Sequence, residues 1–458
     1  MLFHTQIFLL AFLPATLGLY YAFAHAPRTR QYILILASLI FYGWWDVRFV
    51  PLLLGQVVMT WALAGLHFRT GARWPLRLGI CANLAVLGLF KYIDFGISTL
   101  EQILSVTFPR AGLILPIGIS FYTFQVVSYL VDVLRGEAPR YELRRLTLFV
   151  VLFPHLIAGP IVRHNEIIPQ FAEDPLRPGV AERISRGLAL LVAGIAAKVL
   201  IADNLARIAD PVFAAAEQGV PTFSDAALGT LAFALQVFFD FAAYSDMAIG
   251  LALMMGFHFP LNFEQPYRST SLRLFWRRWH MTLSRFLRDY VYIPLGGSRE
   301  GTARYLFAVL FTMGLCGLWH GAGWIFVLWG LGHGIGLAVC RFWDDARLPM
   351  PALLGWLLTF LFAVVLFGLF RATDLASAWR LGAGLVGAGG LGAMWTLSTA
   401  TTLAVALALA LQPLTAKEAL DRWLVPTRAW ATSLAAAAAY AILLVGEGQP
   451  KSFIYFQF

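Results

Sequence analysis

Long runs of apolar residues, separated by short polar stretches, extend along almost the whole chain. They lie at roughly 3–24, 31–45, 49–67, 75–93, 112–134, 145–162, 187–201, 226–256, 304–318, 322–343, 352–370, 395–412 and 429–445. A helix needs about 20 residues to cross the hydrocarbon core of a bilayer, so the runs predict about ten to twelve transmembrane helices. Lipid permits only helices and closed barrels as spanning structures, and these runs are too long for barrel strands. The pattern therefore predicts an all-α, polytopic integral membrane protein.

Two of the runs do not fit a simple crossing. Segment 108–124 holds two prolines and Gly118, which predicts a broken or re-entrant stretch. The run at 226–256 exceeds the length of one crossing and carries Asp240 and Asp246. We therefore expect re-entrant or interfacial helices in addition to the spanning ones.

The segment at about 260–299 differs in kind, because six arginines fall between positions 268 and 288 with no acidic residue among them. At 100° per residue, one side of the predicted helix comprises Trp276, Trp279, His280, Leu283, Phe286 and Leu287. The opposite side comprises Arg273, Arg277, Arg278, Arg285 and Arg288. Such an amphipathic helix lies at the membrane interface with its arginines toward anionic headgroups. Its basic side would also suit an anionic donor such as a phosphate-bearing carrier, and both interpretations stay open. We expect a single domain over 1–458 that includes this segment.

Composition supports the membrane assignment. Hydrophobic residues make up 59% of the 458 residues, charged residues make up 13%, and the mean hydropathy is +0.72. A soluble domain is roughly a quarter charged. The net charge of +9 would suggest nucleic acid as the partner of a soluble protein, but in a membrane protein it reflects Lys and Arg gathered in cytoplasmic loops. We expect membrane lipid and no nucleic acid as a partner.

The cysteines and the N-terminus change this picture little. Cys81, Cys316 and Cys340 lie in apolar runs without a C-x-x-C spacing, so we expect buried packing residues, no disulfide and no metal site. The run at 3–24 has no preceding basic cluster and no convincing cleavage site, and Arg28 follows it. We interpret this run as a retained first span that starts outside and places Arg28 inside.

His320 is the first candidate for chemistry, because it stands alone as an ionisable side chain in an apolar stretch. Ionisable groups at bilayer depth are functional candidates by default. Gly317, Gly321 and Gly323 leave room for another helix or a substrate. An apolar surround favours the neutral imidazole that a general base requires, although a hydrogen bond between helices would explain the residue equally well. His280, at the border of the amphipathic segment, suits either an interfacial ring or a partner of His320.

Asp240, Tyr244 and Asp246 form a further polar group in the longest run. Asp240 and Tyr244 are four residues apart and share a helix face. Carboxylates at bilayer depth need partners, which Lys198, Arg163 or the arginine cluster could supply. Ion pairing is the simpler role, and a proton relay or substrate contact is the alternative.

Four stretches carry a family resemblance. They are 153–163, 240–250, 262–297 with its Phe-Trp-Arg-Arg-Trp-His-Met-Thr-Leu-Ser block, and 318–324, which reads Leu-Trp-His-Gly-Ala-Gly-Trp. Together they resemble the membrane-bound O-acyltransferase (MBOAT) superfamily, and within it the bacterial alginate O-acetyltransferase-like branch, akin to the D-alanyl transfer protein of teichoic acid synthesis. The C-terminal Phe-Ile-Tyr-Phe-Gln-Phe at 453–458 is similar to the same branch. The resemblance covers nearly the whole chain.

The resemblance implies an enzyme of the bacterial inner membrane. The family's principal histidine corresponds to His320 and the second histidine of this branch to His280, both inside a central pore or funnel. An acyl thioester such as acetyl-CoA would enter from the cytoplasm, with no bound cofactor. The acetyl group would pass to a hydroxyl on a periplasmic acetyltransferase partner or on a polysaccharide such as alginate. His320 would act as the general base, and His280 would orient a substrate or transfer a proton. Residues expected to contact donor or substrate are Asn262, Arg277, Arg278, Trp279, Trp319, Asp240, Tyr244 and Asp246.

Two other function classes stay open at this point. A transporter or flippase would also use midplane charges and broken helices, although inverted repeats of such segments are not evident. A scaffold of a polysaccharide export complex would need no chemistry of its own. No Walker loop, G-x-S-x-G elbow, H-E-x-x-H motif or dinucleotide fingerprint occurs, so we expect neither ATP hydrolysis nor a serine nucleophile. Ala242-Ala243 stand where relatives often have Ser-Gly, which leaves the local helix contact undetermined.

Overall fold

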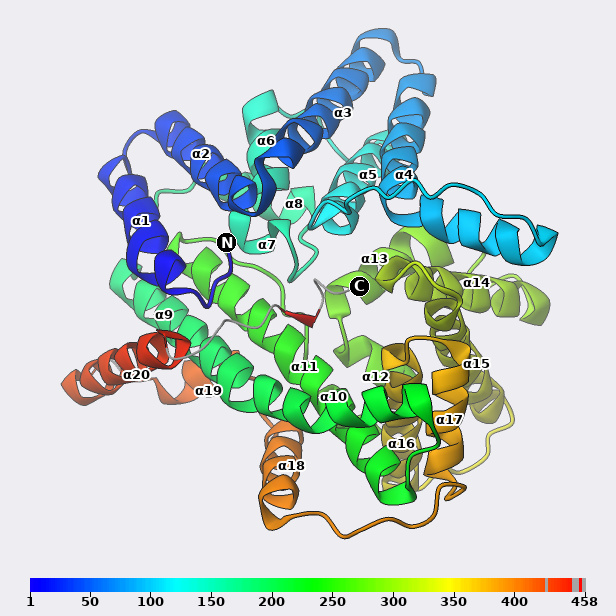
Figure 1. Cartoon of the computed structure of the whole chain (residues 1–458). Coiled ribbons are helices and arrows are strands. Elements are labelled where there is room, and N and C mark those ends of the chain that lie inside the picture. The colour runs from blue at the N-terminus through cyan, green and yellow to red at the C-terminus, as the bar shows by residue number, and fades with distance from the viewer. Residues whose placement is uncertain (425–426, 447–452, 455–458) are drawn as a thin grey trace. The chain divides into compact units, whose positions relative to one another are not determined.

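A computed structural model describes residues 1–424, 427–446 and 453–454 (Figure 1). Every regular element among them is a helix, which confirms the all-α fold class of a multi-pass membrane protein. The described residues form two compact units, each built from separate parts of the chain. The first unit comprises Met1–Val192, Ser245–Pro260 and Trp423–Ser452, and the second comprises Ala193–Tyr244, Leu261–Arg422 and Phe453–Phe458.

The helices of the first unit precede and follow those of the second along the chain. They are η1 (Phe8–Phe12), α1 (Leu13–Ala22), α2 (Pro27–Asp46), η2 (Val47–Phe49), α3 (Val50–Thr70), α4 (Trp74–Leu104), α5 (Ile119–Arg135), α6 (Leu143–Val151), α7 (Phe153–Leu156), α8 (His164–Ile167), η3 (Ile168–Ala172), α9 (Val180–Ala196) except its last turn, and α20 (Arg428–Gly446). Helix α11 (Phe223–Met254) is shared, because its last ten residues belong to this unit.

The second unit holds most of the chain between residues 193 and 422. Its helices are η4 (Ala197–Ala202), α10 (Asp203–Gln218), the first part of α11, η5 (Pro266–Arg268), α12 (Leu272–Arg278), α13 (Met281–Leu287), η6 (Arg288–Tyr292), α14 (Thr302–His320), α15 (Trp324–Asp345), α16 (Ala352–Arg371), α17 (Leu375–Leu385), α18 (Leu397–Ala410) and α19 (Ala416–Trp423). All but one of the predicted site residues lie in this unit.

Eight helical stretches in the described residues are long and apolar enough to cross a bilayer. They are Pro27–Thr70, Trp74–Leu104, Val180–Gln218, Phe223–Met254, Thr302–His320, Trp324–Asp345, Ala352–Arg371 and Arg428–Val445. Two further apolar helices, Phe8–Ala22 and Leu397–Ala410, are shorter, and the stretch Pro27–Thr70 contains both α2 and α3. The figure of ten to twelve spans therefore stays a prediction.

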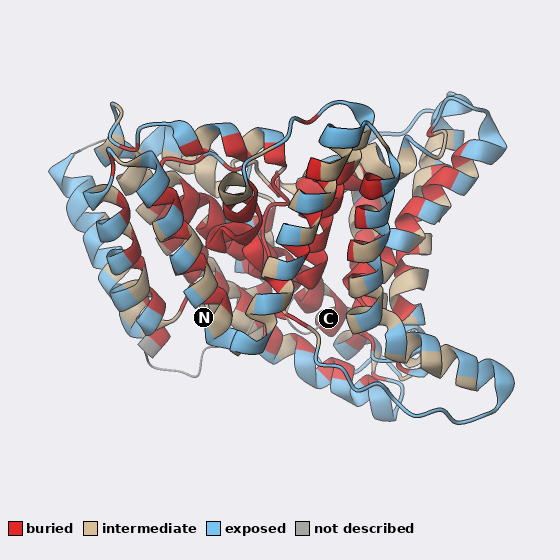
Figure 2. Ribbon diagram, turned by 90° about the horizontal axis from the view of Figure 1, so that it is seen from above, coloured by how far each residue is buried: buried red, intermediate tan, exposed pale blue. Residues whose placement is uncertain are grey.

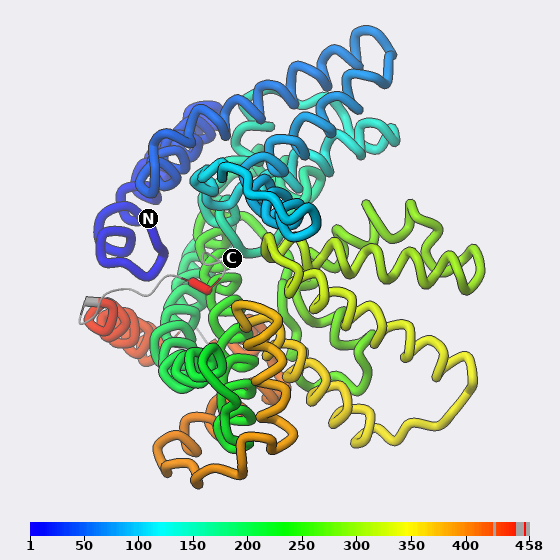
Figure 3. Tube along the Cα trace, turned by 45° about the vertical axis from the view of Figure 1, so that its right-hand side comes forward, coloured from blue at the N-terminus to red at the C-terminus, as the bar shows by residue number. Residues whose placement is uncertain are grey.

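Within the first unit, α3 and α4 form a hairpin of two apolar helices, which Figure 3 traces in blue and light blue. Gly71 joins them with φ 69°, a left-handed conformation that glycine adopts without steric cost. Many residues of α4 are exposed. Figure 2 shows exposed residues in pale blue on the outward-facing sides of the helices. Cys81 lies on this helix and is exposed, so the expected burial is wrong for Cys81 and correct for Cys316. An apolar side chain on a spanning helix can face lipid instead of protein.

The interruption predicted around residues 108–124 is confirmed. The chain is not helical between Leu104 and Ile119, and Gly118 precedes α5 with φ 74°. A Cβ atom at Gly118 would lie 2.6 Å from the carbonyl oxygen of Leu156, so this position admits no side chain. Helix α5 itself is a core element of the first unit, since 14 of its 17 residues are buried.

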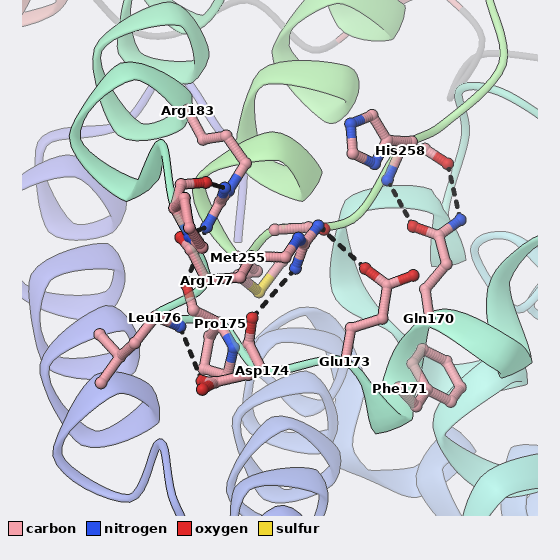
Figure 4. A network of polar contacts seen from close by, with 12 residues as sticks. Gln170, Phe171, Glu173, Asp174, Pro175, Leu176, Arg177, Arg183, Met255 and His258 are labelled. Carbon is pink, nitrogen blue, oxygen red and sulfur yellow. Dashed lines mark hydrogen bonds and ion pairs between the residues drawn. The ribbon is translucent and has the colours of Figure 1, made fainter.

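A polar network holds the segment that follows α11 inside the first unit (Figure 4). The side chain of Gln170 exchanges two hydrogen bonds with the backbone of His258, at 2.8 and 3.2 Å. Arg177 pairs with Glu173 at 3.0 Å and donates to the carbonyl oxygen of Gly256 at 2.7 Å. These bonds satisfy backbone groups of the non-helical segment that follows α11.

Helices α14 and α15 of the second unit touch through their backbones. A Cβ atom at Gly317 would overlap the carbonyl oxygen of Phe326, and one at Gly330 would overlap that of Met313. Small residues allow such close approach of helices in membranes. Of the glycines predicted to leave room beside His320, Gly317 serves this helix contact, the ring of Phe326 fills the space at Gly321, and Gly323 makes only ordinary contacts.

We expect Gly317→Ala to destabilise the protein by about 1–3 kcal/mol, because the added methyl group forces α14 and α15 apart. The measurement is thermal unfolding of the purified protein in detergent. Gly314→Ala is the matched control on the same helix, since its Cβ would lie 3.4 Å from Leu331, an ordinary contact. Equal melting temperatures for the two variants would contradict the backbone contact.

Candidate active site

The second unit contains a row of alternating histidine and tryptophan rings. The order of the rings is His280, Trp319, His320, Trp329, His333 and Trp276. The distances between the centroids of successive rings are 5.9, 4.9, 5.1, 4.7 and 5.0 Å. All six side chains are buried. The two histidines predicted from the sequence are thus brought to either side of one tryptophan, and a third histidine joins them.

His320 is the last residue of α14, and the extended backbone of Gly321 ends the helix there. The turn to α15 is short, because α15 begins at Trp324. The imidazole packs edge-on against Trp329 and against Phe370, 5.4 Å away between centroids. Its exposed fraction is 6%, so the ring lies in an aromatic enclosure. This is the dry, low-dielectric setting in which a catalytic group acts with least competition from water.

His280 lies at a break in the amphipathic segment. The structure has α12, then Trp279 and His280, then α13, with His280 at φ 41°. The expected continuous helix over this segment is therefore wrong. The reason is Asn262, whose backbone carbonyl accepts from the Met281 N–H at 2.9 Å and replaces a helical bond. The apolar and basic sides nevertheless remain, since Trp276, Trp279 and His280 are buried and Arg273 and Arg277 are exposed.

Asn262 also fixes the orientation of the His280 ring. Its Oδ1 lies 3.0 Å from His280 Nδ1 and accepts hydrogen bonds from the hydroxyl and backbone N–H of Thr282, at 3.0 and 3.4 Å. A backbone N–H can only donate, so this amide atom is the oxygen and Nδ1 of His280 carries a proton. In the neutral ring the lone pair is then on Nε2. Asn262, predicted as a substrate contact, is here a positioning residue for His280.

Burial lowers the pKa of His280 to about 3, whereas a solvated imidazole titrates near ~6.5. Between these values the unfolded chain binds a proton that the folded chain does not, so stability is complete above pH ~6.5 and falls as the pH drops toward 3. From pH 7.5 to 5 we expect a loss of up to about 2 kcal/mol from this group. His280→Asn should remove that part of the acid sensitivity in thermal melts at the two pH values, and His25→Asn, at an exposed position, should not. Parallel pH dependence in wild type and His280→Asn would contradict the assignment.

The polar group of α11 lies apart from the histidine row. Asp240 is buried and pairs with Lys198 at 2.6 Å, which confirms Lys198 as its expected partner. Lys198 also contacts Asp203 at 2.9 Å. The second carboxylate oxygen of Asp240 accepts the backbone N–H of Ile454 at 2.8 Å, and Tyr244 packs on Phe453 at 4.9 Å between centroids. The C-terminal segment is thus held by this ion pair. Of the matching hexapeptide, residues 455–458 lie outside the described residues.

Asp246 belongs to the first unit and is only half-buried. Six residues from Asp240, it points about 120° away around the helix. Phe241, next to Asp240, does reach the site, because its ring contacts that of His280 at 4.7 Å. Asp240 therefore supports the site through its neighbour, and contact of either carboxylate with a substrate stays a prediction.

A basic pocket of about 650 Å³ opens beside the row in the second unit. Its lining includes Arg273, Arg277, Arg288, Arg341, Asp344, Asp345, Trp276, Ser284, Tyr292, Tyr305, Thr312, Met313 and Leu337. Both carboxylates are paired with arginines of the lining, Arg273–Asp344 at 2.8 Å and Arg341–Asp345 at 3.3 Å. Trp276 is at once a wall of the pocket and the end of the row.

The remaining expected contacts divide between pocket and core. Arg277 lines the pocket, whereas the pocket lining does not include Arg278. Trp279 is buried and stacks on Phe275, 5.5 Å away at 13°. Trp319 lies between His280 and His320. Sequence reasoning missed His333 and Trp329, although an ionisable group in the apolar stretch of α15 is the same signal that identified His320.

The first unit holds a second buried polar chain that the sequence did not predict. His164 Nε2 lies 3.0 Å from an oxygen of Asp132, and its Nδ1 lies 3.0 Å from the hydroxyl of Tyr141. Tyr129 packs against His164 and donates its hydroxyl to the carbonyl of Pro139. These contacts fasten the loop between α5 and α6 onto α8.

Known proteins resemble the chain over most of its length. Residues 119–378 match the model of MBOAT, the membrane-bound O-acyltransferase family. A probable alginate O-acetylase AlgI of Pseudomonas aeruginosa is 44% identical over 83% of this chain and 74% of its own. A peptidoglycan O-acetyltransferase of Helicobacter pylori is 38% identical over 85% and 81%, and a teichoic acid D-alanyltransferase of Lacticaseibacillus rhamnosus is 27% identical over 73% and 84%. The matched region includes the whole histidine row.

Proposed function

The chain belongs to the membrane-bound O-acyltransferase family, and from this premise we propose that it moves acetyl groups across the bacterial inner membrane for O-acetylation of an exopolysaccharide such as alginate. The donor is a thioester, acetyl-CoA or a similar carrier, that reaches the site from the cytoplasm. The acceptor is a hydroxyl on a periplasmic acetyltransferase partner or on the polysaccharide itself. The observation that carries the proposal is the enclosed row of histidines that begins at the wall of an arginine-lined pocket.

The pocket supports an anionic donor. Four arginines line it. Arg273, Arg341 and Arg288 pair with Asp344, Asp345 and Asp289, and Arg277 adds a further cation that suits a phosphate group. Arg277 projects from the basic side of α12, whereas Trp276 on the same helix borders the row. A carrier bound by its phosphates would place its thioester arm toward Trp276.

His320 supports the chemistry. A hydroxyl is a weak nucleophile, so a base within hydrogen-bond reach must take its proton as the oxygen attacks the thioester carbonyl. The new C–O bond forms, the C–S bond breaks, and the thiolate receives the proton from the imidazolium, so His320 returns to its neutral form. The aromatic rings around His320 exclude water, which would otherwise compete as acceptor.

The relatives support the substrates. Two of them carry names that specify O-acetyl transfer, to alginate and to peptidoglycan. Both acceptors are extracytoplasmic glycans with free hydroxyls. A third relative is named as a teichoic acid D-alanyltransferase, which also transfers an acyl group to a cell-envelope polymer.

The experiment is label transfer by the purified full chain in proteoliposomes, with acetyl-CoA carrying a labelled acetyl group on one side and an oligosaccharide or candidate partner protein on the other. We expect label to appear on the acceptor when donor and acceptor face opposite sides. Label transfer only when both are on one side would contradict movement across the membrane. If the protein consumed no thioester and no acceptor in any arrangement, the proposed reaction would be contradicted.

Arg277→Ala tests the pocket in the same assay. Because a hydrogen bond to a charged group contributes about 1.5–3 kcal/mol, we expect KM for acetyl-CoA to rise roughly tenfold or more while kcat changes less. Arg304→Ala is the matched control, since Arg304 is half-exposed and pairs with Glu300 outside the pocket. An unchanged KM in Arg277→Ala would remove this arginine from the donor site.

A further inference from the structure

His333 lies between the arginine-lined pocket and His320, at mid-length of α15. Its exposed fraction is 0%, and its ring contacts Trp276 at 5.0 Å and Trp329 at 4.7 Å between centroids. Trp276 belongs to the pocket wall, and Leu337, one turn further along α15, lines the pocket as well. On the other side Trp329 contacts His320 at 5.1 Å. His333 is thus one of the buried side chains between the pocket wall and His320.

The hydrogen bond from Trp276 determines which nitrogen of His333 is protonated. The indole Nε1–H of Trp276 donates to His333 Nδ1 at 3.3 Å. An indole nitrogen can only donate, so Nδ1 must present its lone pair. In the neutral imidazole the proton is then on Nε2, and the ring is a hydrogen-bond donor at that atom.

Two buried N–H donors on this face of α15 have no hydrogen-bond acceptor among the described residues. Nε2 of His333 is buried and has no acceptor among the residues that the structure describes. The same holds, within residues 1–424, 427–446 and 453–454, for Nε1 of Trp329, one helical turn earlier. Buried polar groups are nearly always hydrogen-bonded, so a pair of unmatched donors marks a place where another molecule supplies the acceptor. On α14, Thr312 Oγ1 in the pocket wall is buried and unmatched in the same way.

We propose that His333, together with Trp329, donates hydrogen bonds to the carbonyl oxygen of the bound thioester. This inference rests on the proposed acetyl transfer. When the acceptor hydroxyl adds to the carbonyl carbon, negative charge moves onto the carbonyl oxygen, and the two fixed N–H groups stabilise it. The charge returns as the C–S bond breaks. His333 stays neutral throughout and neither gains nor loses a proton, which distinguishes its role from that of the base His320.

Paired substitutions at His333 separate its two nitrogens. Asparagine places an acceptor near the position of Nδ1 and so keeps the bond from Trp276, but offers no donor at the position of Nε2. Glutamine reaches the Nε2 position with an amide N–H. Loss of one donor to a developing oxyanion lowers kcat about 10²- to 10³-fold. We therefore expect a kcat loss in this range for His333→Asn, a smaller loss for His333→Gln, and the same pH profile of kcat as wild type in both.

Comparing the binding of two ligands separates the loss of this hydrogen bond from a general folding defect, because a folding defect weakens the binding of both ligands. S-ethyl coenzyme A lacks the carbonyl oxygen of acetyl-CoA, so wild type should bind acetyl-CoA more tightly, and His333→Asn should lose this preference. Trp329→Phe should lose part of it, whereas Trp343→Phe, near the exposed end of the same helix where its N–H bonds the Leu348 carbonyl, should keep it.

Two results would overturn the proposal. One is a His333→Asn variant with wild-type kcat, and the other is a loss of affinity for both analogues by the same factor, which would indicate a structural role. If wild type transferred no acetyl group while binding acetyl-CoA in preference to the ethyl analogue through His333, the reaction would be misassigned but the hydrogen bond would stand.

Discussion

Replacing His320 by alanine is expected to lower the rate of acetyl transfer about 10²- to 10⁴-fold, because a positioned general base contributes a factor of this size. The initial rate of label transfer from acetyl-CoA by the purified variant measures it. The fold should survive, since His320 is the last residue of α14 and its ring packs against the aromatic rings of Trp329 and Phe370. His67→Ala serves as the matched control, because His67 lies near the end of α3 and bonds the carbonyl of Ala72 outside the histidine row.

The same variant separates the enzyme from a transporter or a scaffold in cells. An enzyme whose base is removed leaves the polymer exported and unacetylated, with normal membrane levels of the protein. Loss of polymer export in His320→Ala would favour a transporter or a scaffold. Acetylation at the wild-type extent would rule out His320 as the base.

Replacing Lys198 by methionine is expected to destabilise the protein by about 3–5 kcal/mol. Lys198 is 2% exposed and contacts the carboxylates of Asp240 and Asp203, so its removal leaves uncompensated charge in the core of the second unit. Asp240 also holds the backbone of Ile454, so this loss should release the C-terminal segment from the core. Thermal unfolding in detergent and protease sensitivity of the C-terminus measure the two effects.

The double variant Lys198→Met/Asp240→Leu should recover part of the lost stability, because it removes the more buried of the two carboxylates left without their cation. An exposed pair provides the control: Lys417 and Asp421 lie 2.8 Å apart at the surface of α19, and Lys417→Met should cost at most about 1 kcal/mol. A Lys198→Met variant no less stable than Lys417→Met would show that the buried pair does not stabilise the fold.

Features that depend on local sequence could be predicted. The period of apolar residues identified the helices, and the isolation of His320 in an apolar stretch identified the centre of the histidine row. The need of a buried carboxylate for a cation identified Lys198 as a partner of Asp240. The inferences about His320 and Lys198 use only the cost of placing a polar group in an apolar medium.

Features that depend on contacts between residues distant in sequence could not be predicted. Asn262 causes the helix break at His280, because its backbone carbonyl accepts a hydrogen bond from the Met281 N–H. Helical periodicity considers only neighbouring residues and could not predict a bond to a residue 19 positions away. The division of α11 between two units separates Asp246 from Asp240, although the two are close in sequence. His333 is functional only because α12 brings Trp276 against it, which the pattern of α15 alone does not indicate.

The backbone contact between α14 and α15 has a consequence for motion during turnover. Helices that meet through Gly317 and Gly330, with no side chain between them, cannot slide or rotate past one another without losing that contact. His320 and His333 therefore keep a fixed mutual register while donor and acceptor come and go. The junction of α12 and α13 is fixed in a different way, because the side chain and the backbone carbonyl of Asn262 bond His280 and Met281.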